Sequence, residues 1–239
     1  MKKEIRLLLF IMVFLHFSCS AQKINFEAKK LIVINQVDDD AFFINFNKSI
    51  KFQFDKNILL AKGSPQETFF NFFKITSSEQ LTSFFNDSIP KSYKKSNYIQ
   101  LMSVYKNKPE KNFYELDSNI ILKDGKNQNS FIKYINHNEL FPKPIASIIY
   151  LELINDKWII KDIGDNFELS IFLLSIKGQV LEKIISKKLS DSESKIIEPY
   201  LINDKIDLKK LSIDFFDLKK NNVNSPLVKL LYDNEFSIF

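Results

Sequence analysis

The feature that most constrains the fold is the clearest strand signal in the chain, which is interrupted only once. Residues 145–154 and 157–163 both have strand character, and Asn155-Asp156 separates them. Asparagine and aspartate tolerate a positive φ angle better than most residues, which suits a two-residue hairpin loop. The pattern therefore predicts a β-hairpin, and we expect this hairpin at the centre of an antiparallel sheet.

Further strands are expected before this hairpin. An apolar run at 31–37 is followed by Asp38-Asp39-Asp40, and from 44 to 54 apolar and polar residues alternate. This period of two predicts an antiparallel hairpin with one buried face, in which the three aspartates form a solvated turn. Residues 98–105, 114–122 and 130–136 also have strand character.

Several helices are predicted from capping residues and apolar spacing. Two segments have the spacing of a capping box, in which a glutamate side chain reaches back to the amide of the cap residue: Ser64-Pro65-Gln66-Glu67 and Thr76-Ser77-Ser78-Glu79. Phenylalanines follow each of them. Apolar residues between 165 and 185 fall at helical intervals and predict one long helix despite Gly178. Two more helices are expected at 208–218 and after Ser225-Pro226. The predicted class is α+β, with helices packed on a curved antiparallel sheet and a helical C-terminal extension.

The first eighteen residues have the composition of a secretory signal peptide. Lys2, Lys3 and Arg6 precede an apolar run at 7–17, and small residues follow it. An eleven-residue helix is about 16 Å long, whereas the hydrocarbon layer of a bilayer is about 30 Å thick. The run is therefore too short to serve as a permanent membrane span.

The residues after this run resemble a bacterial lipoprotein signal. Ser18-Cys19-Ser20 has a small residue before the cysteine, and Cys19 is the only cysteine in the chain. An isolated thiol has no disulfide partner in an oxidising compartment, so lipid attachment gives it a purpose. The resemblance implies an outer-membrane anchor facing the periplasm, because Ser20 is not the aspartate associated with inner-membrane retention. The alternative is cleavage after Ala21, which releases a soluble periplasmic or secreted protein.

The stretch from 64 to 165 resembles the NTF2-like superfamily. Helices rich in phenylalanine come first, strands follow, and the hairpin ends in Lys157-Trp158-Ile159-Ile160. The resemblance implies a cone in which a helix and the concave face of the sheet enclose a pocket. Its expected lining residues are Phe69, Tyr98, Tyr134 and Trp158. We divide the chain into a signal peptide (1–18), a tether (19–30), an α+β domain (31–165) with a possible NTF2-like core (64–165), and a helical C-terminal region (166–239).

The positive charge does not indicate a nucleic-acid partner. The net charge is +5, but every basic residue after Arg6 is a lysine. The expected folded part therefore lacks the guanidinium groups that bind phosphate and guanine in a bidentate manner. The remaining partner hypotheses are a membrane, through the lipid anchor, and an envelope protein or a small apolar ligand.

No motif in the chain selects a reaction. His137 is the only histidine after the leader, and we interpret it as a solvated loop residue between Asn136 and Asn138. Zinc sites, thiol catalysis and glycine-rich phosphate loops lack the required residues, so no metal, cofactor or catalytic residue is expected. The leading hypothesis is a non-enzymatic binding or accessory module. A pocket hydrolase or isomerase on an NTF2-like fold and a structural component of an outer-membrane complex are the alternatives.

Overall fold

The computed structural model confirms the α+β class, with helices packed against a largely antiparallel sheet. It describes residues 22–23, 29–32, 40–52, 58–59, 62–75, 77–85, 108, 110–124, 127–185, 187–202, 205–235 and 237–238. The leader, Cys19, Tyr98 and the strand expected at 98–105 lie outside these ranges. Strand backbone is present within the segment predicted as a tether, where β1 (Gln22–Lys23) pairs in parallel with β4 (Ile58–Leu59).

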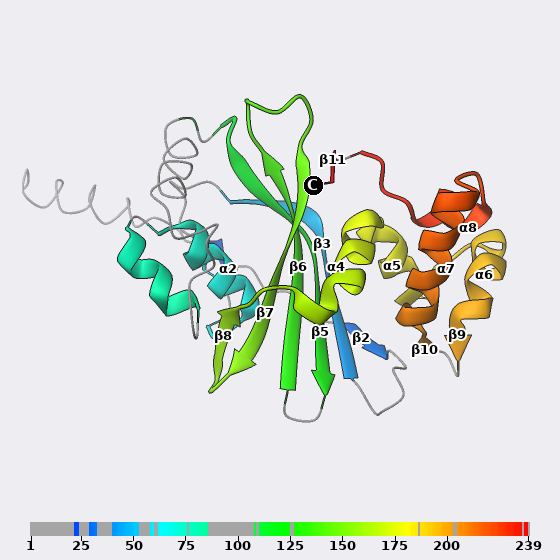
Figure 1. Ribbon diagram of the computed structural model, residues 1–239, viewed down its shortest axis with the longest axis horizontal. Helices are drawn as coiled ribbons and strands as arrows, with labels where there is room; N and C mark the ends of the chain where they lie inside the picture. Colours follow the sequence, from blue (N-terminus) through cyan, green and yellow to red (C-terminus); the bar gives the residue numbers. More distant parts are fainter. Residues whose placement is uncertain are drawn as a thin grey trace, which may run out of the picture.

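Seven strands of the described chain form the main sheet (Figure 1). The order across it is β11 (Ser237–Ile238), β7 (Ile145–Ile154), β6 (Asn127–His137), β5 (Phe113–Asp124), β3 (Asp40–Phe52) and β2 (Lys29–Ile32), and β8 (Lys157–Ile160) pairs with the last residues of β7. Neighbouring strands are antiparallel except for β11, which runs parallel to β7.

The β7–β8 hairpin forms as predicted, but its expected place in the sheet is wrong. Its loop residues Asn155 and Asp156 have φ angles of 49° and 61°, as a two-residue hairpin loop requires. However, β8 lies at the edge of the sheet, and β5 and β6 lie at its centre. Strand character indicates which segments pair into a sheet, but it carries no information about which strands become neighbours.

The first hairpin is also confirmed in its pairing, because β2 and β3 are antiparallel neighbours. Asp40, which the sequence places in the turn, instead pairs with Ile32 as the first residue of β3. The other two aspartates of the expected turn lie outside the described residues.

Two helical elements cover one face of the sheet. The first, α2 (Pro65–Phe73), begins at Ser64, whose side chain accepts a hydrogen bond from the Glu67 amide. Glu67 does not reach back to the cap amide as expected; its carboxylate accepts from the amide of Gly63, one residue earlier. The second, η1 (Ser78–Phe84), is a 3₁₀ helix with a capping box between Ser77 and Gln80, so the predicted box at 76–79 is displaced by one residue.

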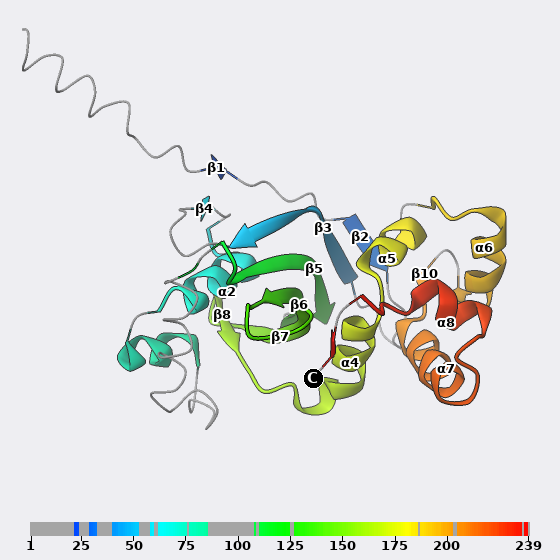
Figure 2. The ribbon, with the colours of Figure 1, turned by 90° about the horizontal axis from the view of Figure 1, so that it is seen from above.

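The opposite face of the sheet is covered by α4 (Phe167–Ser175) and the helices after it, and Figure 2 shows α2 and α4 on either side of the central strands. Residues of β6 alternate between the two cores. Ile132 and Tyr134 belong to the core under α2, whereas Phe131 and Ile135 belong to the cores under α4 and its neighbours. Both faces of the central strands are therefore buried in apolar packing.

The long helix expected from 165 to 185 is broken. After η2 (Gly164–Asn166) and α4, Ile176 is extended and forms a bridge with Tyr232, and α5 (Gly178–Ile185) then begins. The amide of Lys177 donates to the carbonyl of Leu231, which is a contact with a segment more than fifty residues later. This tertiary pairing overrides the helical spacing of the local sequence.

The remaining helices pack into the same core as α4. They are α6 (Asp191–Ile197), η3 (Glu198–Tyr200), α7 (Leu208–Asn221) and α8 (Pro226–Leu231), and β9 (Leu201–Ile202) pairs with β10 (Lys205–Ile206) between them. The predicted α7 and α8 are confirmed, with caps at Asp207 and Ser225. α6 was not among the predicted helices, although the spacing of Ser190 and Glu193 is that of a capping box.

Candidate functional site

A bulge in β5 includes an acidic residue that lies opposite a buried lysine. Leu116 pairs with Tyr134 and Ser118 pairs with Lys133, so Asp117 is an extra residue on its strand. The extra residue reverses the alternation, because Leu116 packs under α2 whereas Ile120 packs under α4. Bulges commonly re-aim a side chain in this way. At the bulge, Asp117 and Ser118 lie together opposite Lys133, and the residues after them change face.

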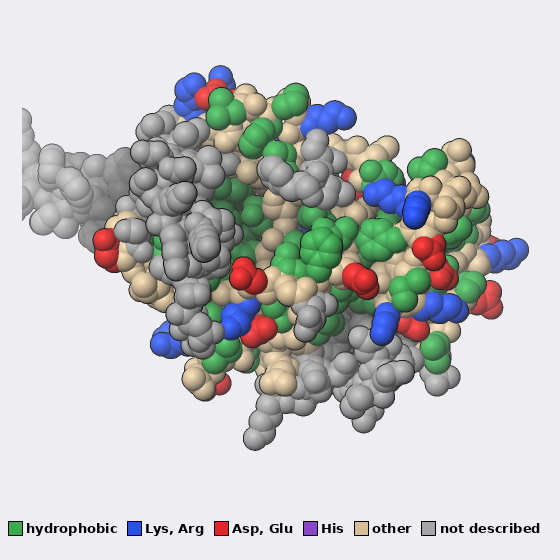
Figure 3. Space-filling view, viewed as in Figure 1, with side chains coloured by type: hydrophobic (Ala, Val, Ile, Leu, Met, Phe, Trp, Pro, Cys, Tyr) green, Lys and Arg blue, Asp and Glu red, His purple; other side chains and the backbone are tan. Residues whose placement is uncertain are grey.

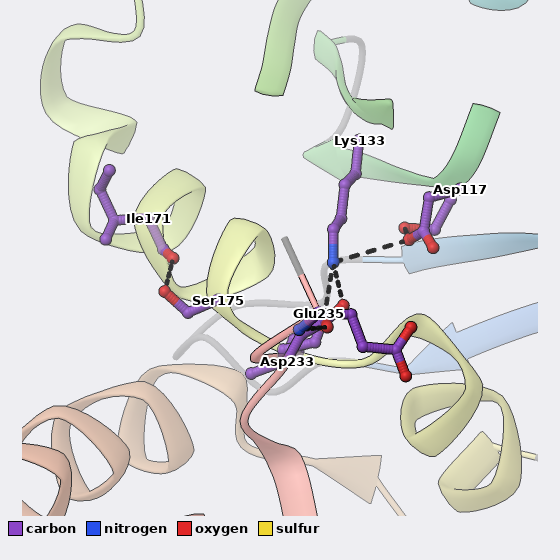
Figure 4. Close-up of polar contacts among 8 residues, drawn as sticks. Asp117, Lys133, Ile171, Ser175, Asp233 and Glu235 are labelled. Carbon is purple, nitrogen blue, oxygen red and sulfur yellow. Dashed lines mark hydrogen bonds and ion pairs between the residues drawn. The ribbon is translucent and has the colours of Figure 1, made fainter. Parts of the chain in front are cut away.

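Lys133 is the centre of a polar cluster inside an otherwise apolar interface (Figure 4). Lys133 is 1% exposed. Its Nζ donates to the carbonyl of Ile176 at 2.8 Å and to Oδ2 of Asp233 at 3.2 Å, and it lies 3.9 Å from Oδ2 of Asp117. An ammonium group has three donors and must be paired when it is buried. The lysine therefore ties the sheet to the α4–α5 junction and to the segment after α8.

Two carboxylates, those of Asp117 and Asp233, lie beside the single ammonium group of Lys133. Burial raises the pKa of the Asp117 carboxyl above its usual 3.8. Lys133 and the Ser118 hydroxyl, which donates to Oδ2 of Asp117 at 2.9 Å, pull this pKa down, and nearby Asp233 and Glu115 push it up. Asp117 therefore holds its proton more firmly in the folded protein than in the unfolded chain.

A second polar pair lies near the end of β5 and β6. Nε2 of His137 is 2.9 Å from Oε2 of Glu115, and the His137 ring stacks on Phe113 with 4.3 Å between ring centroids. The side chains of His137 and Glu115 are 24% and 22% exposed. The interpretation of His137 as a solvated loop residue is thus wrong, because it is the last residue of β6 and has two partners.

Three of the four residues predicted to line a pocket come together under α2. Phe69 is fully buried, and its ring centroid lies 5.1 Å from that of Tyr134. Trp158 belongs to the same cluster and donates from Nε1 to the carbonyl of Gly63 at 3.1 Å. Tyr98 lies outside the described residues. Ligand binding by this aromatic cluster stays a prediction.

The core under α2 also contains a polar pair that sequence analysis did not single out. The Ser130 hydroxyl donates to Oδ1 of Asn119 at 2.7 Å, and both residues are fully buried. Among the described residues, Asn119 Nδ2 has no hydrogen-bond partner. A buried amide that is only partly satisfied costs free energy, so this pair marks a weak point of the core.

Large apolar side chains are exposed at several places on the surface. Leu140 and Phe141, adjacent in the β6–β7 loop, are 71% and 38% exposed, and Leu201 and Ile202 form a second adjacent pair in β9. Glu139, next to Leu140, forms ion pairs with Lys108 and Lys111 at 2.7 Å and 3.6 Å. Figure 3 shows apolar side chains gathered around α4 on another part of the surface, bordered by acidic ones, and Phe167 at the start of α4 is exposed.

The lysine cluster was not found from the sequence, although one signal was present. Lys133 has Phe131 and Ile135 two positions away on either side, so the alternation of β6 places a charge on a buried face. Its partner Asp233 follows α8, and no local pattern connects positions one hundred residues apart.

Comparison with protein families, with curated proteins and with solved structures finds no match to this chain. Within the described ranges, His, Cys, Asp and Glu side chains form no group of three that could hold a metal ion. The helices described here also include none with the length and apolar character needed to cross a bilayer.

Proposed function

We propose that the protein is an exported bacterial envelope lipoprotein, anchored to the outer membrane through lipid on Cys19 and facing the periplasm. There it acts as a binding or accessory module for a protein or a small apolar ligand. The observation that carries the proposal is the short apolar run at 7–17, after which Ser18 and then the only cysteine of the chain follow. The leader accounts for export, and the isolated thiol accounts for the anchor.

The contacts of the titratable groups support a non-enzymatic role. A catalytic base or nucleophile must reach its substrate, and its partners must be free to exchange protons with it. Lys133 is instead buried and bound by Ile176 and Asp233, and it joins elements of the fold to one another. The contacts of Lys133 therefore have a structural role that does not require a reaction.

The exposed apolar pairs support a role in binding. Leu140 and Phe141 are exposed in the loop between β6 and β7, and these paired strands give the loop a defined position. Exposed aromatic and aliphatic residues that lie together are typical anchors of protein interfaces. This loop is our first candidate for contact with an envelope protein.

We further propose that the α+β body is an NTF2-like cone. Two features support this finer assignment: α2 packs across one face of an antiparallel sheet, and Trp158 lies in the hairpin that ends it. In such a cone the aromatic cluster of Phe69, Tyr134 and Trp158 would supply the contacts for a small apolar ligand.

Labelling with a fatty acid in a bacterial host tests the anchor. We expect the native chain to incorporate the label and to fractionate with membranes, because the modified thiol carries the lipid. Cys19→Ser and Cys19→Ala are matched variants that keep the size of the side chain small and remove the thiol. Equal labelling of native and variant chains would contradict the proposal.

Photo-crosslinking in cells tests the binding role. A crosslinking amino acid at position 140 is expected to give discrete products with an envelope protein, and Phe141→Ser is expected to weaken them. Val223, which is 54% exposed in the turn between α7 and α8, provides the matched control position. The same products from positions 140 and 223 would show random collision and would contradict a specific surface.

A pocket hydrolase or isomerase is the second candidate, because the contact between His137 and Glu115 is one that a catalytic base could use. A panel of esters and enolisable ketones distinguishes the two functions. The binding proposal predicts the same background turnover for the native chain, for His137→Gln and for Glu115→Gln. Turnover that both variants abolish would favour the enzyme.

A further inference from the structure

Lys133 and Asp233 bring an amine and a carboxyl group into contact inside the protein. Nζ of Lys133 lies 3.2 Å from Oδ2 of Asp233, and the two side chains are 2% and 9% exposed. The residues are one hundred positions apart in the sequence, in β6 and in the segment after α8. Two reactive groups that are held in fixed positions react as if each were present at a very high concentration. The pair is therefore placed for condensation to an amide.

The surroundings of this pair are apolar. Phe131 and Ile135 lie two positions from Lys133 on either side in β6, and Ile148 pairs with Lys133 on the neighbouring strand β7. Leu174 of α4 packs against Ile135 in the same core. Two charges are costly to keep in such surroundings even when they are paired. An amide has no net charge, so its formation from the ion pair, with release of water, removes this cost.

A second carboxyl group lies beside the same amine. Oδ2 of Asp117 is 3.9 Å from Nζ of Lys133, and such contacts are commonly longer before a reaction than during it. Burial raises the pKa of the Asp117 carboxyl, so this carboxylate accepts a proton more readily than an exposed one. Asp117 is thus placed to take a proton from the amine and to return it to the oxygen that leaves.

We propose that Lys133 and Asp233 condense to an intramolecular isopeptide bond, with Asp117 as the group that transfers the proton. The ion pair is the reactant of this step and is the state of the newly folded chain. The step occurs once in each chain and requires no external substrate, so the burial of Lys133 is no obstacle to it. This inference goes beyond the proposed binding role and does not depend on the lipid anchor.

The proposed step balances in atoms and protons. Nζ of Lys133 passes one proton to Oδ2 of Asp233 along their hydrogen bond, and the electron pair that is freed on nitrogen forms a bond to the carboxyl carbon. The nitrogen gives a second proton to Asp117. Asp117 passes this proton to the Asp233 hydroxyl as the C–O bond breaks, and one water leaves. The hydrogen that stays on the amide nitrogen continues to donate to the carbonyl of Ile176, which lies 2.8 Å from Nζ.

Peptide mass spectrometry of the full chain, folded and then incubated, tests the bond. After digestion with trypsin we expect one branched peptide that contains both Lys133 and Asp233 and is lighter by one water than its two components together. Lys183 and Glu193 are the internal control, because they are 3.0 Å apart in an exposed ion pair and should stay in separate peptides. Separate peptides for Lys133 and Asp233, or a branched peptide at the control pair as well, would overturn the proposal.

Gel electrophoresis of the denatured chain gives a second readout of the same bond. The bond closes a loop of the chain between Lys133 and Asp233, so the unfolded chain is more compact. We expect the native chain to migrate faster than Asp233→Ala, and Lys133→Met to migrate like Asp233→Ala. Equal migration of all three chains would overturn the proposal.

Asp117→Ala tests the proton transfer, because it leaves both reacting groups in place. In chain refolded from urea we expect the branched peptide to form about 100-fold more slowly in this variant than in the native chain. Ser118→Ala is the matched control at the same bulge. It removes the hydroxyl that donates to Asp117 but keeps the carboxyl, and it should form the bond at close to the native rate. Equal rates in Asp117→Ala and the native chain, or equal slowing in both variants, would overturn the role of Asp117.

Discussion

Replacing Lys133 by methionine isolates the energetic role of the buried cluster. The substitution keeps the length and apolar stem of the side chain but removes the ammonium group. Asp233 and the carbonyl of Ile176 then lose their donor, and Asp117 loses the charge that offsets its burial. Removing one partner of a buried ion pair costs about 3 to 5 kcal/mol. Because Asp117 is 25% exposed and can be hydrated, we expect a loss near 3 kcal/mol at the lower end of that range.

Urea unfolding at neutral pH measures this loss. Lys183→Met is the control, since Lys183 pairs with Glu193 on the surface, and it should change stability by no more than the error of measurement. The double variant Lys133→Met, Asp233→Asn should recover about 1 to 3 kcal/mol, because it removes a carboxylate that the single variant leaves unpaired.

The pH dependence gives a further check on the same substitution. A protonated carboxyl needs no opposite charge, so the deficit of Lys133→Met should shrink as the pH falls and Asp117, whose pKa is raised, takes up a proton. A deficit equal to that of Lys183→Met, or one that does not change with pH, would refute the argument that buried carboxylates depend on Lys133.

Three other predictions concern single side chains. Because the pKa of Asp117 is raised on folding, its favourable contribution is complete below 3.8 and is lost as the pH rises through the raised value. Asp117→Asn should therefore gain stability relative to the native chain with rising pH in urea titrations, and a constant difference would contradict this. Ser64→Ala removes the cap of α2 and should cost about 1 kcal/mol in urea unfolding. At Asp156, where φ is 61°, valine should lower the melting temperature and glycine should not.

Features encoded by neighbouring residues were predictable from the sequence. The caps at Ser64 and Ser225 and the hairpin at Asn155-Asp156 depend on a few consecutive residues, and the structure has each of them where expected. The α+β class follows from the same local patterns. The capping box predicted at 76–79 instead begins at Ser77. Several residues that can cap a helix follow one another here, so the sequence does not show which of them is the cap.

Features that depend on distant contacts were not predictable. The break at Ile176 arises from its bridge with Tyr232, and β11 pairs with β7 although the two strands are far apart in the sequence. Ile120 lies in the core under α4 because of the bulge at Asp117, since an uninterrupted alternation from Leu116 would place it under α2. A period of two in the sequence does not show where an extra residue interrupts the ladder.

The central claim is that Cys19 becomes the lipid-bearing first residue of an exported protein. Mass spectrometry of the amino-terminal peptide, taken from protein extracted from bacterial membranes, tests it most directly. We predict a peptide that begins at Cys19 and carries the added mass of acyl chains. A peptide that begins at Gln22, or an intact amino terminus at Met1, would contradict the claim.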